Sequence, residues 1–174
     1  MDFIIGLPRT TKQNNVIMVV VDKLSKVAHF IPIKSTCKAI DIDNIFMKEI
    51  FRLHGMPKEI VSDRDTKFTS NFWKSLMAGF ETKLLLINTT YHPQTNGQKE
   101  RVNQIVEDML RMHVMHHPKR WEDYFQLVEF SYNNGYQESL NMSPIEALYG
   151  RQCKIPISWS NPVDRITIVP DMLK

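Results

Sequence analysis

The chain has 174 residues, of which 43% are hydrophobic and 24% charged, so it can bury one core and is unlike a disordered segment. A formal net charge of +3 permits contact with nucleic acid without indicating it. The longest apolar run is too short to cross a bilayer, and Cys37 and Cys153 are too isolated for a disulfide scaffold or a zinc knuckle. We therefore expect one intracellular domain with no membrane segment.

The first part of the chain has the pattern of β-strands. Residues 3–5 are a short apolar run that Gly6 and Pro8 end. Residues 16–21 (VIMVVV) are apolar on both faces, which is typical of a strand in the middle of a sheet. Residues 27–33 (VAHFIPI) follow closely, and Pro32 suits an edge strand. The pattern predicts three antiparallel strands.

Helix and strand alternate in the middle of the chain. Apolar residues recur at helical spacing between Ile42 and Leu53, and Gly55 supplies a stop. Residues 59–62 form a short strand, Ser70 can cap a helix that carries Trp73, and residues 83–87 (KLLLI) form another buried strand. This alternation predicts that the two strands are parallel.

The remaining elements are helices. A loop rich in Gly, Pro and Asn is predicted over residues 88–97, followed by a helix with an apolar stripe through Val102. A second helix after Pro118 carries Trp121 and Phe125, which we expect in the core or at a dimer face, and Ser143 opens a third helix. Together the elements predict a mixed α/β sheet of five strands, three antiparallel and two parallel, flanked by helices.

Two acidic residues have positions that suit chemistry. Asp63 directly follows the strand at residues 59–62, and ligands bind at the carboxyl ends of parallel strands. Glu100 lies in the first turn of the predicted helix, on the face away from the apolar stripe. The alternative explanation for Glu100 is that an acidic residue in a first turn favours the helix dipole.

Several motifs, in this order along nearly the whole chain, make it resemble a known family. They are residues 22–30 (DKLSKVAHF), 53–57 (LHGMP), 62–64 (SDR), 91–103 (YHPQTNGQKERVN), 107–111 (EDMLR) and 147–151 (ALYGR). With them the chain resembles the integrase catalytic core of Ty3/gypsy-type long-terminal-repeat retrotransposons. The resemblance implies a ribonuclease-H-like fold and a metal-binding triad of two aspartates and a glutamate. Asp63 and Glu100 match the second and third members, 37 positions apart.

Two residues compete for the first position of the triad. Asp22 ends the most evident strand, whereas Asp2 lies in a motif, residues 1–4 (MDFI), where the family has its metal-binding aspartate. We assign Asp2. Asp22 is then expected to accept hydrogen bonds from the backbone of Ser25 and Lys26 in a turn.

The resemblance also implies the chemistry and the partners. The chain would be a Mg²⁺-dependent polynucleotidyl transferase, with Mn²⁺ as a substitute ion, that processes retrotransposon DNA ends and joins them to target DNA. Asp2 would bridge two ions, and Asp63 and Glu100 would complete one site each, because Mg²⁺ prefers oxygen ligands. Implied partners are DNA and further copies of the chain, in the nucleus and away from membranes.

Polar and basic residues near Glu100 are the expected DNA contacts. They are Arg64, Gln94, Asn96, Gln98, Lys99, Arg101 and Asn103. The alternative is an ordinary polar surface loop. Two rival functions also stay open, namely a noncatalytic DNA-binding or dimerisation fragment of a decayed integrase, and a nuclease of the same fold, which the HPQTNGQ stretch disfavours.

The domain organisation departs from the family pattern. We expect residues 1–151 to be the catalytic core, with its first strand truncated, and residues 152–174 to be an extension towards a tail domain. Because the family has residues before the first aspartate, Met1 is interpreted as an internal methionine of a longer polyprotein. Asn96 replaces the more common Asp, and Glu81 replaces a Gly.

Overall fold

The structure is a computed structural model, and it describes residues 1–62, 69–86, 93–114, 119–151 and 153, with the backbone alone at residues 71–72, 93–100 and 112–114. Its strands are β1 (Asp2–Ile4), β2 (Val16–Val21), β3 (Ala28–Ile33), β4 (Glu59–Ser62) and β5 (Lys83–Leu86). β1, β2 and β3 form one antiparallel sheet in that order, and β4 pairs with β5 in parallel. The predicted three antiparallel and two parallel strands are confirmed. Their hydrogen bonds form two sheets instead of the single five-stranded sheet that was predicted.

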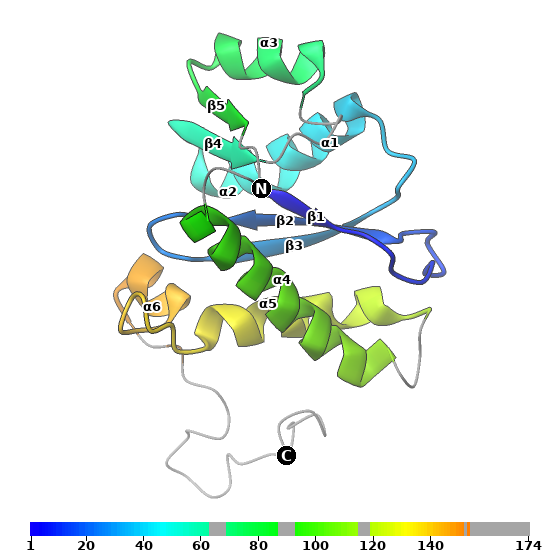
Figure 1. Cartoon of the computed structure of the whole chain (residues 1–174), viewed down its shortest axis with the longest axis vertical. Helices are drawn as coiled ribbons and strands as arrows, with labels where there is room; N and C mark the ends of the chain where they lie inside the picture. Colours follow the sequence, from blue (N-terminus) through cyan, green and yellow to red (C-terminus); the bar gives the residue numbers. More distant parts are fainter. Residues whose placement is uncertain (63–68, 87–92, 115–118, 152, 154–174) are drawn as a thin grey trace, which may run out of the picture.

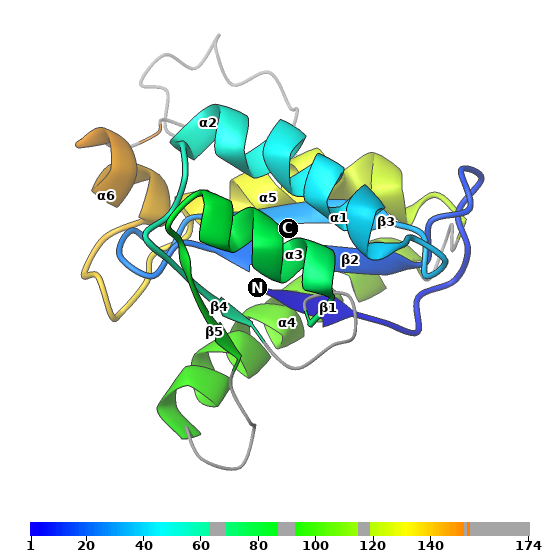
Figure 2. The same cartoon turned by 90° about the horizontal axis from the view of Figure 1, so that it is seen from above.

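Helices cover both faces of the three-stranded sheet (Figures 1 and 2). α1 (Ala39–Phe46) continues through a π-helical segment, η1 (Met47–Phe51), into α2 (Arg52–His54), where Gly55 ends the helix with a φ of 72°. The other helices are α3 (Asn71–Gly79), α4 (Pro93–Val114), the 3₁₀ turn η2 (Trp121–Tyr124), α5 (Phe125–Asn134) and α6 (Pro144–Tyr149). Ser70 and Ser143 cap α3 and α6 by accepting backbone N–H bonds of 3.2 Å, as predicted. No helix among the described residues is long and apolar enough to cross a membrane.

The central strand β2 separates two cores. Ile17 and Val19 face a cluster built with α4, η2 and α5, in which Trp121 is fully buried. Val16 and Met18 face a second cluster built with α1 and α3. Because successive side chains of a strand point to opposite faces, burial on both faces explains the continuous apolar run of β2.

The outer edge of β3 is closed by side chains of α5. The Asn133 amide donates to the carbonyl of Ala28 and accepts from its N–H, both at 2.8 Å. The carboxylate of Glu129 accepts from the N–H of Phe30 at 3.0 Å. These bonds occupy backbone groups that an edge strand would otherwise offer to another chain.

Two predictions about secondary structure were wrong. β5 is a half-exposed edge strand rather than a buried one, since α3 covers only the face that carries Leu84 and Leu86, and Leu85 is 44% exposed. The loop expected to reach Gly97 gives way to helix at Pro93. Proline fits a first turn because its missing N–H would have no helical partner there, and a glycine inside a helix costs only about 1 kcal/mol.

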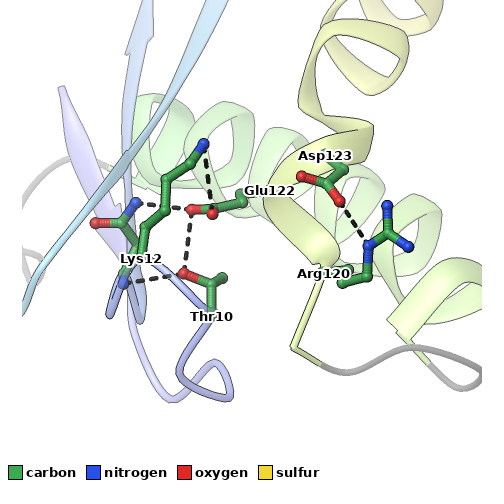
Figure 3. A network of polar contacts seen from close by, with 6 residues as sticks. Thr10, Lys12, Arg120, Glu122 and Asp123 are labelled. Carbon is green, nitrogen blue, oxygen red and sulfur yellow. Dashed lines mark hydrogen bonds and ion pairs between the residues drawn. The ribbon is translucent and has the colours of Figure 1, made fainter.

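The segment between β1 and β2 is fixed to η2 by a buried carboxylate (Figure 3). Glu122, whose side chain is 3% exposed, accepts hydrogen bonds from the Thr10 hydroxyl at 3.1 Å and the Asn14 amide at 2.8 Å. Lys12 adds an ion pair at 3.6 Å. The Trp121 indole also donates to the carbonyl of Pro8 at 2.6 Å. These contacts hold the chain that leaves β1 and thereby support the strand that carries Asp2.

Candidate active site

Asp2 lies on β1 opposite Val19 of β2, and its side chain is half-buried. One carboxylate oxygen accepts the backbone N–H of Phe3 at 2.9 Å. The other accepts the side-chain amide of Asn103, on α4, at 2.8 Å. The carboxylate is therefore oriented by its own strand and by the long helix.

The start of β1 lies beside β4. The Met1 nitrogen donates a hydrogen bond of 2.6 Å to the carbonyl of Val61, one residue before the buried Ser62 that ends β4. Asp2 is thus held near the carboxyl end of β4, the edge at which the sequence predicts a site. Asp63 and Arg64 lie outside the described residues, so their place in the site stays a prediction.

The backbone of α4 relates Glu100 to Asp2. Glu100 precedes Asn103 by three residues, and residues at that spacing lie on one face of a helix. Because Asn103 contacts Asp2, position 100 lies on the face of α4 that borders Asp2. Glu100 is the eighth residue of α4 rather than part of its first turn, so the helix-dipole alternative no longer explains it, since that effect fades beyond the first turn.

The residues predicted to contact DNA have different settings in the structure. Gln94 and Asn96 belong to α4 and not to the loop predicted over residues 88–97, which corrects their expected setting. Gln98 and Lys99 also lie in α4. Arg101 is exposed on the same helix. Asn103 is oriented towards Asp2, with its amide oxygen buried and without a hydrogen-bond partner among the described residues. DNA contact by these side chains stays a prediction.

Asp22 has the structural role predicted for it. It accepts hydrogen bonds of 2.7 Å from the backbone N–H and the hydroxyl of Ser25, in the turn between β2 and β3. The N–H of Lys26 bonds to the backbone carbonyl of Asp22 at 3.1 Å and not to its carboxylate, a small correction. Burial raises the pKa of Asp22, but hydrogen bonds from Ser25, Leu24 and Lys23 outweigh burial and lower it below the usual value.

A histidine pair beside Asp22 was not predicted from the sequence. Nε2 of His29, on β3, lies 2.8 Å from Nε2 of His54 at the end of α2, and Nδ1 of His29 lies 3.0 Å from Glu129 of α5. Burial and the neighbouring His29 lower the pKa of His54, while Asp22 opposes them. Both histidines lie in motifs of the family resemblance, residues 22–30 and 53–57, but neither these motifs nor local periodicity indicates that the two side chains meet.

The described residues contain no group of three or more His, Cys, Asp or Glu arranged to hold a metal ion. Asp2 suits Mg²⁺, because its carboxylate supplies hard oxygen donors and Asn103 orients it. A complete ligand set additionally needs Asp63, outside the described residues, and the side chain of Glu100, which is not described.

Comparison with solved structures identifies the fold. The catalytic core domain of HTLV-2 integrase, solved in complex with magnesium in a trimeric form, matches with a TM-score of 0.64 at 15% identity, over 84% of this chain and 93% of that chain. A chain from the structure of a simian T-cell lymphotropic virus intasome in complex with the PP2A regulatory subunit B56 gamma matches with a TM-score of 0.70 at 15% identity, over 92% of this chain and 57% of that chain. The chain therefore has the ribonuclease-H-like fold of integrase catalytic cores.

Comparison of sequences identifies the family. The Tf2-3 and Tf2-4 transposon polyproteins of Schizosaccharomyces pombe are each 38% identical over 149 residues, which is 86% of this chain and 11% of theirs. No protein-family model matches the chain. The chain belongs to the integrase catalytic cores of Ty3/gypsy-type retrotransposon polyproteins. It spans only about a tenth of the length of these relatives.

Proposed function

We propose that this chain is the catalytic core of a DNA-integrating polynucleotidyl transferase, which processes retrotransposon DNA ends and joins them to target DNA. The observation that carries the proposal is the position of Asp2, which is bound by Asn103 of α4 and lies beside β4. In a chain with an integrase fold, this position brings one carboxylate to the strand edge that leads to Asp63 and to the helix face that contains Glu100.

Asp2, Asp63 and Glu100 are the residues that we propose would hold Mg²⁺. Two structural neighbours were solved in complex with magnesium, which supports that choice of ion. A bound pair of ions would activate the attacking oxygen and stabilise the leaving oxygen of an in-line displacement at a phosphodiester. The protein's own part is to fix the carboxylates, and the bond from Asn103 does this for Asp2.

We further propose that DNA ends and target DNA bind along α4, through Gln94, Asn96, Gln98, Lys99, Arg101 and Asn103, with Arg64 as a further contact from outside that helix. We also propose that the chain acts as a homo-oligomer in the nucleus. Neighbours of the same fold were solved in dimeric and trimeric forms and in an intasome, which supports assembly. Arg101 is exposed on α4 and lines the same cavity as Asp2, so it is a described basic side chain of α4 that can meet a phosphate near Asp2.

A disintegration assay on branched DNA, with Mg²⁺ or Mn²⁺, tests the proposed function. We expect disintegration products, namely a rejoined target strand and a released element end, from a version extended at its amino terminus. We expect Asp63→Asn and Glu100→Gln to lower the rate by orders of magnitude while circular dichroism stays unchanged. Arg111→Gln is the matched control on α4, since Arg111 is exposed and pairs only weakly with Glu107, at 3.9 Å. Normal turnover by Glu100→Gln contradicts the assignment of Glu100, and salt-sensitive DNA binding without any products favours the noncatalytic alternative.

A further inference from the structure

Two histidines from distant parts of the chain meet through their ring nitrogens. Nε2 of His29, on β3, lies 2.8 Å from Nε2 of His54, the last residue of α2. The ring centroids are 5.0 Å apart and the ring planes are tilted by 49°, so the rings meet by their edges and do not stack. His54 is exposed and the side chain of His29 is 18% exposed, so ions in solution can reach the pair.

A carboxylate determines which nitrogen of His29 carries the proton. Oε1 of Glu129, on α5, lies 3.0 Å from Nδ1 of His29. An ionised carboxylate can only accept, so Nδ1 carries the proton and the lone pair of Nε2 faces His54. The other oxygen of Glu129 accepts the N–H of Phe30 at 3.0 Å, which holds the carboxylate in place. A carboxylate that orients a histidine through one ring nitrogen is typical of histidines whose other nitrogen binds a metal ion.

His54 can supply the second nitrogen without losing a proton to solvent. Desolvation and the neighbouring His29 lower its pKa, although Asp22 opposes them, so the ring is neutral at pH 7. In the metal-free chain the single proton between the two Nε2 atoms belongs to His54. A neutral imidazole can carry that proton on Nδ1 instead. This change of tautomer leaves the lone pairs of both Nε2 atoms for one ion.

We propose that His29 and His54 form a binding site for a divalent transition-metal ion of the Ni²⁺ and Cu²⁺ type. When each metal–nitrogen bond is about 2.0 Å long, a separation of 2.8 Å places the two nitrogens at roughly a right angle around the ion. Square-planar and octahedral coordination have this angle, whereas the tetrahedral coordination of Zn²⁺ needs a wider one. Water takes the remaining positions, since no third His, Cys, Asp or Glu among the described residues is arranged to complete the site.

The ion at this site would connect three elements of the fold. His54 ends α2, His29 lies on β3, and Glu129 reaches His29 from α5. An ion that binds the native state and not the unfolded chain raises stability as its concentration increases. Imidazole nitrogens favour late transition metals, whereas Mg²⁺ prefers oxygen ligands. The histidine site is therefore separate from the proposed Mg²⁺ site at Asp2, and it does not depend on the proposed function.

Two measurements on the chain of residues 1–174 test the site. The first is residue-resolved NMR with less than one equivalent of Cu²⁺, whose unpaired electron broadens nearby signals; we expect the amides of His29 and His54 to broaden first. The second is calorimetric titration with Ni²⁺. His54→Gln should weaken Ni²⁺ binding by about tenfold or more, because it removes one of the two ligands. His113→Gln is the matched control, since it removes a histidine of α4 and leaves the pair intact, so the affinity should be unchanged.

Two further variants separate this site from the other parts of the molecule. Glu129→Gln keeps both ligands but removes the charge that orients His29, so it should weaken Ni²⁺ binding by about tenfold. Asp2→Asn should leave the Ni²⁺ affinity unchanged, because the two sites are separate. Equal Ni²⁺ affinity of the wild type and His54→Gln overturns the proposal. So does broadening that begins at any of the other four histidines, a result that needs only the wild-type chain.

Discussion

The side-chain amide of Asn103 donates a hydrogen bond of 2.8 Å to the carboxylate of Asp2, although 101 positions separate the two residues in the chain. This bond connects β1 to α4 at the carboxylate that we propose as a metal ligand. Asn103 uses its amide group for Asp2 and leaves its buried amide oxygen without a partner among the described residues. A buried polar atom without a hydrogen bond lowers the stability of the fold unless a ligand or a water molecule binds it. A role in the proposed site therefore explains Asn103 better than packing does.

Replacing Asn103 by Ala should weaken the site without unfolding the chain. Asp2 would lose the donor that orients it, and removal of such an orienting partner lowers metal affinity or activity about 10- to 100-fold. The measurement is the Mg²⁺ dependence of disintegration by the extended enzyme, where we expect a higher Mg²⁺ requirement. Gln104→Ala is the control, because Gln104 is exposed and its amide bonds to Asp108 rather than to Asp2. An unchanged Mg²⁺ requirement for Asn103→Ala would show that the bond has no positioning role.

Asp2 and Asp22 should respond differently to the same substitution. Asp2→Asn removes a charge from the proposed metal site and should lower activity by orders of magnitude. Asp22→Asn keeps an oxygen that can accept from Ser25 and should leave activity within a few-fold. Parallel assays of the two variants in the extended enzyme decide between the two assignments. The opposite ranking of activities means that Asp22, and not Asp2, belongs to the triad.

Asp43 should make the protein less stable at neutral pH than at mildly acidic pH. It is 2% exposed on α1, its carboxylate oxygens have no hydrogen-bond partner among the described residues, and burial raises its pKa to about 6. The native state then holds the proton more tightly than the unfolded state, so this contribution to stability falls as pH rises from about 4 to about 6. Asp43→Asn should raise the free energy of unfolding at pH 7.5 by about 1–3 kcal/mol, and by much less at pH 4.5.

Urea unfolding of the wild type and Asp43→Asn at both pH values provides this measurement. Asp41→Asn is the control, since Asp41 lies two residues away on the same helix but is exposed and bonds to the N–H of Lys38. A gain for Asp43→Asn that is equal at the two pH values would mean that the charge of Asp43 is not the cause.

The pair of His29 and His54 should make the protein less stable at mildly acidic pH than at neutral pH, which is the opposite of the effect of Asp43. An ionised Glu129 can only accept, so Nδ1 of His29 carries the proton and its Nε2 accepts from Nε2–H of neutral His54. Because the pKa of His54 is lowered, the unfolded state takes up a proton first as pH falls below about 6.5, and stability drops in that range. His54→Gln can still donate to His29 but cannot titrate, so we expect a flatter stability profile from pH 7 to pH 5. If His54→Gln shows the same fall as the wild type, another group is responsible.

The sequence predicted those parts of the fold that depend on local patterns. β2 and β4 have their predicted bounds. In β2 this is because residues buried on both faces leave a continuous apolar run between turn residues. The start of α4 was not predicted, because Pro93, Asn96 and Gly97 are residues that favour turns. In the structure all three lie within the helix. The family motifs indicated which carboxylates to consider, and the structure describes the setting of one of them, Asp2.

Contacts between distant elements could not be predicted in this way. The bond from Asn103 to Asp2 spans 101 positions, and the contacts of His29 with Glu129 and His54 span 100 and 25. Hydrophobic periodicity identifies the face of an element that is buried, but not the polar residue that it meets on another element. Asp43 was missed for the same reason, since a charged residue within a helix is expected on the exposed face.

DNA binding should be weak, largely independent of sequence and sensitive to salt. A net charge of +3 gives a weak overall field, so affinity must come from a local basic group along α4 such as Lys99 and Arg101. Lys99→Ala should lower affinity for every sequence and make the slope of log affinity against log salt shallower by about 0.9, if Lys99 contacts one phosphate. Fluorescence anisotropy at several salt concentrations measures both quantities, with Arg111→Ala as the control farther along the helix. Tight binding with no salt dependence contradicts phosphate contacts along α4, because releasing counterions from phosphates is what makes such binding depend on salt.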